Sequence, residues 1–302
     1  MRRSVRIFWY IFLAGFLGFI LIVLLANFGV FGKMPSLKEL ENPSILQSSE
    51  VYANDGTLMG RYYREHANRS NVQYKDISKN VIDALVSTED ERFYKHSGID
   101  FKSTLRAIFL LGHEGGGSTI TQQLAKTLLD QGSKNKAWRI IEKIKEYIIA
   151  IKLERNFTKE EIIALYLNAV PFGDNTYGIR NASRTFFQKE PDRLDVDEAA
   201  LLIGMLKGNT LYNPRKNYKA AFDRRNVVIS QMEANNTVSH EEAARLKALP
   251  IKLSYRKMDE NNGYAPYFRE ILKGEIADVL KDVKKPDGSS YSIYDDGLRI
   301  FR

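Results

Sequence analysis

The sequence of 302 residues contains no cysteine and only four histidines. Because cysteine is missing, disulfide bonds and thiolate chemistry are both excluded. A metal ion could bind only through histidine, carboxylate or carbonyl groups. The spacing G-x-x-x-x-G-K-[ST] is also absent, which excludes a P-loop nucleotide site, and no internal repeat is visible.

Charge is missing from the 25 positions Ile7–Phe31 near the N-terminus. An apolar helix of ~20 residues crosses the hydrocarbon core of a bilayer, so a single transmembrane helix is predicted here. Arg2, Arg3 and Arg6 precede it and predict a cytoplasmic N-terminus, with the rest of the chain outside. A cleaved signal peptide would have a shorter apolar core and a small-residue cleavage site after it. The sequence therefore predicts an uncleaved, single-pass anchor in the cytoplasmic (inner) membrane.

The remaining composition is ordinary for a folded protein. Hydrophobic residues make up 44% and charged residues 27%, which argues against disorder. The length suits one large domain or two small ones. The net charge of +8 would suit anionic lipid, phosphate ligands or nucleic acid equally. Because the predicted anchor places the basic excess outside the cytoplasm, we expect no nucleic-acid partner.

Beyond the anchor, the chain is predicted to be mostly helical with one β-hairpin. The hairpin is expected in Val51–Tyr63 around Asp55-Gly56, and nothing later repeats its pattern. From Ser78 onward the apolar residues follow a helical period. Four helix starts are indicated by pairs of capping residues spaced three positions apart: Thr119/Gln122, Thr158/Glu161, Asp195/Glu198 and Ser239/Glu242. The last pair opens the final predicted helix.

An apolar helical stretch, Phe101–Gly112, carries more apolar residues than a helix with one buried face needs. Packing into the core is the favoured explanation, and contact with the bilayer surface is the alternative. If the bilayer is contacted, Leu105–Leu111 and Thr127–Leu129 are the expected contact segments.

An acidic cluster dominates the stretch Thr88–Asp100. Glu89, Asp90 and Glu91 fall at the C-terminal end of the helix that begins near Ser78, where carboxylates oppose the helix dipole. Phe93, His96 and Gly98 follow in a segment too short for a second helix. This pattern suggests a functional site, and a solvated acidic face is the alternative.

A glycine-rich loop, Gly115–Gly117, leads through Ser118 and Thr119 into a helix. Glycines let the backbone approach a ligand closely, and a helix N-terminus presents unpaired N–H groups to an anion. Lys126, two turns into the helix, could reach the same anion. The alternative is a simple helix cap after a flexible loop.

The longest helical pattern, Ala137–Phe157, places Glu146 between Lys143 and Lys145, with Glu142 four residues earlier. Charge on a helix face is usually only solvation, and that remains the alternative for Glu146. The apolar residues predicted to form the buried stripe are Trp138, Ile141, Ile144, Ile148 and Ile151.

Taken together, these segments resemble the peptidoglycan glycosyltransferase domain, glycosyltransferase family 51, the lipid II polymerase of class A penicillin-binding proteins. The resemblance covers roughly residues 76–232. Its motif E-D-x-x-F-x-x-H-x-G is complete in Glu89–Gly98, and its motif G-G-S-T-I-T-Q-Q is complete in Gly116–Gln123, with Lys126 following.

The third motif of the family, R-K-x-x-E, is only partly present. Lys143 and Glu146 match, but Glu142 stands where the family has arginine, and a preceding basic residue is shifted by one to Arg139. Later family features are Tyr166-Leu167-Asn168, Phe172-Gly173, Tyr177-Gly178-Ile179 and Glu198-Ala199-Ala200.

The resemblance implies a mostly α, lysozyme-like, two-lobed glycosyltransferase domain with a small N-terminal β-hairpin, preceded by one transmembrane helix. The predicted organisation is a cytoplasmic tail (1–6), the transmembrane helix (7–31), a connector with the hairpin (32–75), the glycosyltransferase domain (76–249) and a linker toward a transpeptidase domain (250–302). Ser133–Lys136 fits the transpeptidase S-x-x-K pattern, but no K-T-G or K-S-G follows, so no transpeptidase site is predicted. A fragment of a bifunctional enzyme is favoured over a monofunctional one.

The function implied is polymerisation of lipid II into β-1,4-linked glycan strands, with release of undecaprenyl pyrophosphate and inversion at the anomeric carbon. Glu89 would be the general base. Lys126, Lys143 and the Ser118-Thr119 loop would face the pyrophosphate, and Glu146 would orient the lysines or hold a divalent cation (Mg²⁺ or Mn²⁺).

The resemblance and the residue patterns together give the set of candidate site residues. Glu89 and Glu146 are the candidate catalytic residues. The candidate substrate-binding residues are Asp90, Phe93, His96, Gly117, Ser118, Thr119, Gln122, Gln123, Lys126, Arg139, Lys143 and Lys145. Expected partners are lipid II, the growing glycan strand, the membrane and proteins of cell-wall synthesis.

Two alternative functions remain open from the sequence. A lytic, lysozyme-like enzyme would use Glu89 as an acid, although the intact glycine loop with Lys126 speaks against it. A catalytically inactive scaffold that binds lipid II or partner proteins is suggested by the incomplete third motif.

Overall fold

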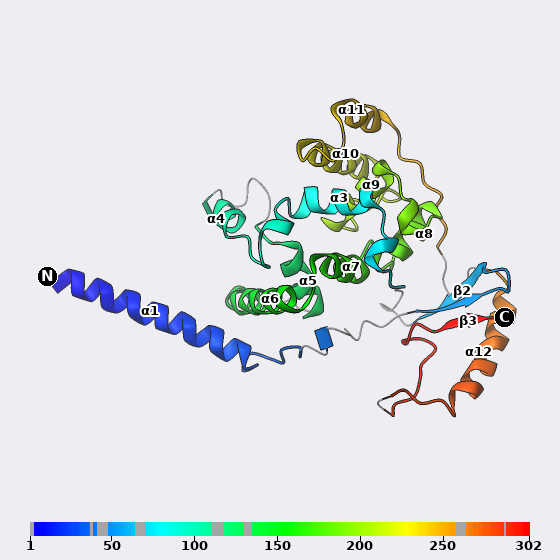
Figure 1. Cartoon of the computed structure of the whole chain (residues 1–302), viewed down its shortest axis with the longest axis horizontal. Coiled ribbons are helices and arrows are strands. Elements are labelled where there is room, and N and C mark those ends of the chain that lie inside the picture. Colours follow the sequence, from blue (N-terminus) through cyan, green and yellow to red (C-terminus); the bar gives the residue numbers. More distant parts are fainter. Residues whose placement is uncertain are drawn as a thin grey trace. The chain divides into compact units, whose positions relative to one another are not determined.

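The computed structural model describes residues 3–36, 39–40, 48–63, 70–109, 117–129, 135–257, 264–286 and 288–302. It consists of two compact units. The first unit comprises Met1–Pro43 and Phe93–Ile162, and the second comprises Ser44–Arg92 and Ile163–Arg302. The chain is mostly helical, with a small sheet and an N-terminal apolar helix, as predicted (Figure 1).

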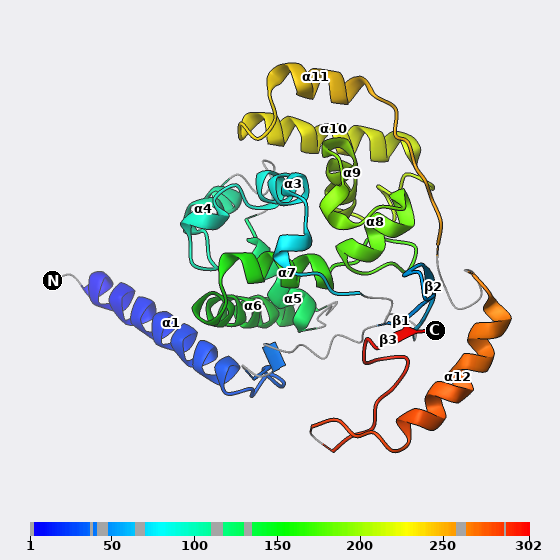
Figure 2. The ribbon, with the colours of Figure 1, turned by 45° about the vertical axis from the view of Figure 1, so that its right-hand side comes forward.

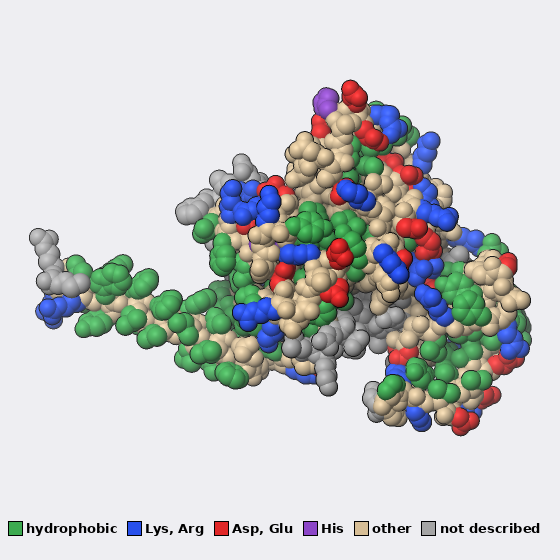
Figure 3. All heavy atoms as spheres, viewed as in Figure 1, with side chains coloured by type: hydrophobic (Ala, Val, Ile, Leu, Met, Phe, Trp, Pro, Cys, Tyr) green, Lys and Arg blue, Asp and Glu red, His purple; other side chains and the backbone are tan. Residues whose placement is uncertain are grey.

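The described secondary structure of the first unit is helical. Helix α7 (Lys159–Ala169) begins in this unit and continues into the second. The other elements of the first unit are α1 (Arg3–Asn27), the 3-10 turn η2 (Phe93–Lys95), α4 (Phe101–Phe109), α5 (Ile120–Leu128) and α6 (Lys136–Asn156). Helix α1 has a mean hydropathy of 2.6 over its most apolar window, and none of that window is buried. Figure 3 shows its hydrophobic side chains along the face in view. At 25 residues it is long and apolar enough to cross a membrane.

Helix α6 packs on α5, and its buried face matches the predicted stripe only in part, since Ile144 is buried as predicted. Ile149, Ala150 and Leu153 are fully buried, whereas Trp138 and Ile151, assigned to the predicted stripe, are exposed. The reason is that apolar residues surround this helix, so more than one stripe satisfies the helical period.

Helix α4 is a second correction to the predicted core. Phe101 and Leu105 are 72% and 53% exposed, so the described apolar side chains of this helix do not pack into the core. Of the predicted contact segment Leu105–Leu111, residues 110–111 lie outside the described residues, as do the side chains of 107–109.

The second unit holds a helical core and the sheet (Figure 2). Its further helices are η1 (Tyr74–Asp76), α3 (Lys79–Glu89), α8 (Ile179–Phe187), η3 (Pro191–Arg193), α9 (Val196–Leu206), α10 (Tyr218–Ala234), α11 (His240–Ala248) and α12 (Pro266–Leu280). The predicted starts of α3 and α9 are confirmed, since the Ser78 side chain accepts from Asn80 N–H and Asp195 with Glu198 forms a complete capping box. Helix α9 is buried throughout Ala199–Met205, and α3 and α10 pack against it.

The sheet has three strands rather than the two of the predicted hairpin. β1 (Ser49–Tyr52) pairs antiparallel with β2 (Leu58–Tyr62), as predicted, and parallel with β3 (Arg299–Phe301). Helix α12 covers the sheet through Leu272, which packs against Val51 and Tyr62. Both α12 and β3 lie in 250–302, where no further helix or strand was predicted. Three residues of strand are too few to give a periodic signal by themselves.

Candidate functional site

Thr119 joins the end of the acidic motif, Phe93–Gly98, to the glycine-loop motif within the first unit. Its hydroxyl accepts from the N–H of Gln122 (3.1 Å), which caps α5, and donates to the carbonyl of Gly98 (2.7 Å). The Gln122 amide also donates to that carbonyl (3.2 Å). The predicted Thr119/Gln122 pair is therefore only half a capping box. The Gln122 side chain donates to the Gly98 carbonyl instead of accepting from the backbone N–H of Thr119. The reciprocal bond is replaced by one that ties the glycine-loop helix to the end of the acidic motif.

Only glycine fits at position 98, where the acidic motif meets α6. Its φ is +87°, and a Cβ atom there would lie 2.9 Å from the carbonyl oxygen of Ala150 on α6. A side chain would therefore be strained and would clash with helix backbone, which cannot give way. The Phe93–Gly98 segment can approach α6 closely only with glycine at this position.

Lys143 connects Glu146 to the loop before α5. Its ammonium donates to the Ser118 hydroxyl (2.9 Å) and to a carboxylate oxygen of Glu146 (2.7 Å). Glu146 is only 7% exposed, so the alternative of a solvated helix face is wrong for this residue. A cation thus lies beside the N-terminus of α5, the end at which the helix dipole favours an anion. The arrangement is suited to binding phosphate oxygens.

A second ion pair, missed from the sequence, supports the same segment. Lys159 donates to Glu154 (2.8 Å) and to the carbonyl of His96 (2.7 Å), and its ammonium lies 4.2 Å from the centre of the buried Phe93 ring. Glu154 in turn accepts from Thr121 (2.6 Å). These contacts fix the aromatic and histidine part of the motif to α5 and α6. No local pattern could have found them, because Glu154 and Thr121 are 33 residues apart.

The other candidate residues of the first unit are arranged less tightly. Lys126 and Arg139 are exposed, while Gly117 and Gln123 are half-buried. Lys145 is buried but points elsewhere, since a Cβ atom on Gly32 would lie 3.5 Å from its ammonium. Of the glycines in the loop, 115 and 116 lie outside the described residues.

Glu89 and Asp90 belong to the second unit, where Glu89 is the last residue of α3 and Asp90 its C-cap. Asp90 is 8% exposed, and Glu91 is exposed. The buried Tyr166 interacts electrostatically with Glu89: burial raises the pKa of the Tyr166 hydroxyl, and the Glu89 charge raises it further. The phenol is therefore protonated at neutral pH. Sequence reasoning named Tyr166 only as part of a family segment and gave it no place near Glu89.

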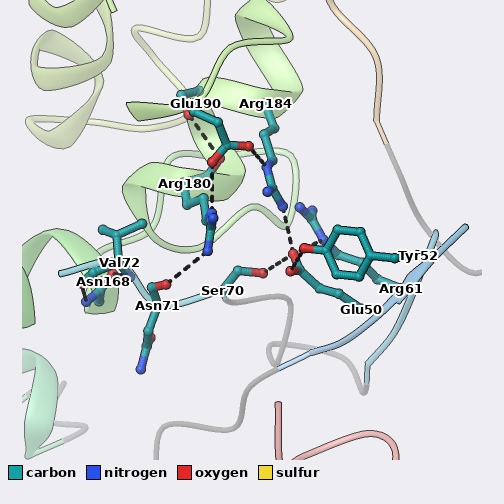
Figure 4. A network of polar contacts seen from close by, with 11 residues as sticks. Glu50, Tyr52, Arg61, Ser70, Asn71, Val72, Asn168, Arg180, Arg184 and Glu190 are labelled. Atoms are coloured by element: carbon teal, nitrogen blue, oxygen red, sulfur yellow. Dashed lines mark hydrogen bonds and ion pairs between the residues drawn. The ribbon is translucent and has the colours of Figure 1, made fainter. Parts of the chain in front are cut away.

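The later family features have structural roles in the second unit. The Asn168 amide binds both the N–H (3.0 Å) and the carbonyl (2.9 Å) of Val72, which holds the segment before η1 against α7 (Figure 4). Gly178 has φ +77° and would bring a Cβ atom within 3.0 Å of the Asn168 carbonyl oxygen. Glu198 accepts from the N–H of Asp195 and caps α9. These residues shape the fold around the motifs.

The donor set for a resident metal ion is thin. Among the described residues, no three histidine or carboxylate side chains converge on one point. Glu146 could offer one carboxylate, and it is already bound to Lys143. The geometry does not fit a protein-held ion, and a cation would need most of its oxygen ligands from a phosphate substrate.

Comparison with known proteins first identifies the class. The profile of the transglycosylase family matches residues 55–233, more than half of the chain, and the chain belongs to this family. This match contains both complete motifs, the Lys143–Glu146 pair and Tyr166.

Individual relatives are class A penicillin-binding proteins. The chain is 33% identical over 232 residues to penicillin-binding protein 2a of Streptococcus pneumoniae, covering 74% of this chain. It is 30% identical over 273 residues to penicillin-binding protein 1A of Escherichia coli, covering 89%. In both cases the chain spans about 30% of the relative's length. The crystal structure of penicillin-binding protein 1A from Haemophilus influenzae matches 85% of this chain and 26% of that one, at 23% identity and a TM-score of 0.43.

Proposed function

We propose that the protein is a peptidoglycan glycosyltransferase that polymerises lipid II into β-1,4-linked glycan strands and releases undecaprenyl pyrophosphate. Membership of the transglycosylase family supports this proposal. The observation that carries it furthest is the Lys143 ammonium, shared by Ser118 and Glu146 at the N-terminus of α5. A transferase with a pyrophosphate leaving group needs such an anion site, whereas a glycan-cleaving enzyme has no pyrophosphate to bind.

Glu89 is proposed as the general base that takes the proton from the acceptor's 4-hydroxyl. The 4-oxygen attacks the anomeric carbon from the side opposite the pyrophosphate leaving group, so the configuration at that carbon is inverted. A base must lie within hydrogen-bond reach of the proton it abstracts. Its position at the end of α3, followed at once by the buried Asp90, supports a fixed carboxylate. The protonated Tyr166 nearby adds no competing charge.

Lys143 is proposed to stabilise the negative charge that develops on the departing pyrophosphate, with Lys126 and the N–H groups of α5 as further donors. Glu146 would hold the Lys143 ammonium in place in the absence of substrate. A bound divalent cation would supply further neutralisation of the phosphates. Glu146 is then the protein ligand proposed for it, with phosphate oxygens and water supplying the others.

The helix α1 is proposed to anchor the protein in the cytoplasmic membrane, with the N-terminus in the cytoplasm and the catalytic part outside. Its length and uninterrupted apolar surface support a membrane span. The basic residues before it favour this orientation. Lipid II, the growing strand and proteins of cell-wall synthesis are the proposed partners.

Incubation with labelled lipid II tests the proposal. The wild-type protein is expected to form polymer, and Glu89→Gln is expected to lose at least ~10²-fold in rate, because an amide cannot accept the proton. Glu91→Gln is the matched control, since Glu91 is exposed and two positions away. Shortened glycan strands would identify a lytic enzyme, and binding without turnover would identify a scaffold. Equal polymerisation by wild type and Glu89→Gln would refute the assignment of the base.

A further inference from the structure

A pocket of about 320 Å³ lies in the second unit, and none of its lining residues belongs to the proposed catalytic motifs. Its walls come from the β1–β2 hairpin, α8, η3 and the segment after α11. The lining is strongly basic, with Glu190 as the one carboxylate among its residues. The basic residues that line it are Arg61, Arg184, Lys189, Arg193 and Arg256. So many positive charges in one cavity must be neutralised either by a bound anion or by carboxylates of the protein itself.

At the inner end, Arg61 has an unused hydrogen-bond donor. The residue is only 1% exposed, and its Nε donates to Glu50 (3.2 Å). Its Nη2 is buried and has no hydrogen-bond partner in the described part of the chain. A buried donor left without an acceptor costs about 1–3 kcal/mol, so native structures rarely keep one without a reason.

Glu50 does not supply the missing acceptor, because its carboxylate is already saturated. It binds Arg184 Nη1 (2.7 Å), the Ser70 hydroxyl (2.7 Å) and the Tyr52 hydroxyl (2.5 Å) in addition to Arg61 (Figure 4). Arg184 is likewise shared between Glu50 and Glu190. The internal carboxylates therefore neutralise the framework of the pocket and leave Arg61 Nη2 available.

At the mouth, two further guanidiniums are uncompensated. Arg193 and Arg256 are exposed, and neither forms an ion pair with a carboxylate of the described residues. Arg256 is held over the Tyr264 ring, 4.8 Å from its centre, which orients its guanidinium without neutralising it. Lys189 differs, because Asp195 and Glu198 both bind it. Unused cationic donors thus stand at both ends of one cavity.

We propose that this pocket binds a phosphate-bearing ligand. Guanidinium groups match phosphate oxygens with two parallel hydrogen bonds, and three arginines here have donors to offer. The volume exceeds what a lone ion needs and admits a diphosphate or a phosphate ester of a small polyol. The residues that line it are different from the proposed catalytic residues, and the proposal does not depend on the roles of the latter.

The test uses the full-length chain in detergent, titrated calorimetrically with inorganic pyrophosphate at constant ionic strength. Every sample carries Lys143→Met, so that binding at the N-terminus of α5 is weakened throughout. Saturable binding is expected, and Arg193→Ala with Arg256→Ala is expected to raise the Kd at least tenfold. The matched control is Lys219→Ala with Arg245→Ala, which removes the same charge from exposed helix positions. The control is expected to change the Kd less than twofold.

A second variant and a second probe sharpen the result. Gln188→Glu inserts one negative charge at an exposed lining position and is expected to weaken binding severalfold more than Gln188→Met, which equally removes the amide's hydrogen bonds to the carbonyls of Arg184 and Arg256. Glycerol 3-phosphate stands for the phosphate ester of a lipid or polymer, and pocket-dependent binding of either probe supports the proposal and identifies the source. Equal weakening by both double variants, or no saturable binding of either probe, would overturn it.

Discussion

Two buried glutamates, Glu50 and Glu146, bind basic side chains in different ways. Glu50 accepts from two guanidiniums, a tyrosine and a serine, and its partner Arg184 lies 134 positions away in the chain. Glu146 is bound by Lys143, three positions earlier on the same helix. The Lys143 side chain is 36% exposed, whereas that of Arg61 is 1% exposed.

The difference is the one expected between a structural carboxylate, Glu50, and the proposed functional one, Glu146. The Glu50 network joins β1, β2 and α8, elements distant in sequence, and every part of its carboxylate is used. Lys143 lies at the surface and shares its ammonium between a carboxylate and a loop hydroxyl, so an incoming phosphate could recruit it at little cost. We expect substitutions at Glu50 to change stability and substitutions around Glu146 to change activity.

The largest effect is expected for Glu50→Gln. The buried Arg61 would lose its counter-charge and the half-buried Arg184 one of its two, and breaking a buried ion pair costs about 3–5 kcal/mol. The measurement is the free energy of unfolding from urea titration of the detergent-solubilised protein. Glu242→Gln is the control, since its pair with Arg245 is exposed and no resolvable change is expected. An equally small change for Glu50→Gln would contradict the structural role.

The pH dependence of stability should reveal the same carboxylate. The two arginines and the hydroxyl donors outweigh the effect of burial and lower the pKa of Glu50 from 4.5 to about 2. Because the folded-state pKa is the lower one, this stabilisation is fully present above pH 4.5 and is lost as the pH falls toward 2. The lowering of the Glu50 pKa corresponds to about 3 kcal/mol of folding free energy. Urea titrations at pH 6, 4.5 and 3 should show the gap between wild type and Glu50→Gln shrinking. A constant gap would contradict it.

Parts of the candidate site were predictable because their signals are local. The start of α3 at Ser78 and the cap at Thr119 follow from short patterns, and the structure has both. The side-chain contacts of Gln122 were not predictable, since its side-chain oxygen could have accepted from the Thr119 N–H as in a capping box, and only packing directs the amide N–H to the Gly98 carbonyl. The Glu154–Lys159 support for Phe93 depends on contacts between distant segments, which no local pattern reports.

The fold shows the same division between local and distant information. The hairpin is encoded by the turn at Asp55-Gly56, and its two strands are adjacent in the chain. β3 is stabilised instead by pairing with Glu50–Tyr52 across almost the whole chain. The buried face of α6 was predicted only in part, because its sequence is apolar on several sides and packing against α5 decides which side is buried.

A smaller effect is expected at the functional carboxylate's partner. Lys143→Met should lower kcat/KM for lipid II polymerisation by about 10²-fold, because a positioned cation at a developing phosphate charge contributes about 2.7 kcal/mol. Stability should change little, since Lys143 is partly exposed. Lys152→Met on the same helix is the matched control for charge and hydrophobicity. Similar losses in both variants would show that Lys143 acts only through net charge.

The smallest effect is expected for Glu142→Arg, which restores the family's arginine before Lys143. Glu142 and Glu146 are four residues apart on α6, so the substitution removes a like-charge pair worth about 0.2–0.5 kcal/mol and adds a cation near the proposed pyrophosphate site. Lys145 is a poor substitute for that arginine, because it is buried near Gly32, whereas Lys143 binds Ser118. Arg139, one turn earlier and exposed, is the better candidate.

For Glu142→Arg we therefore expect a severalfold gain in polymerisation and a weaker dependence on Mg²⁺, measured with lipid II over a Mg²⁺ titration. If Arg139 already compensates, Arg139→Ala should lower activity in the wild type and have less effect beside Glu142→Arg. Unchanged activity and unchanged Mg²⁺ dependence in all three variants would mean that this helix face does not contribute to pyrophosphate binding, and would confine the anion site to Lys143 and the N-terminus of α5.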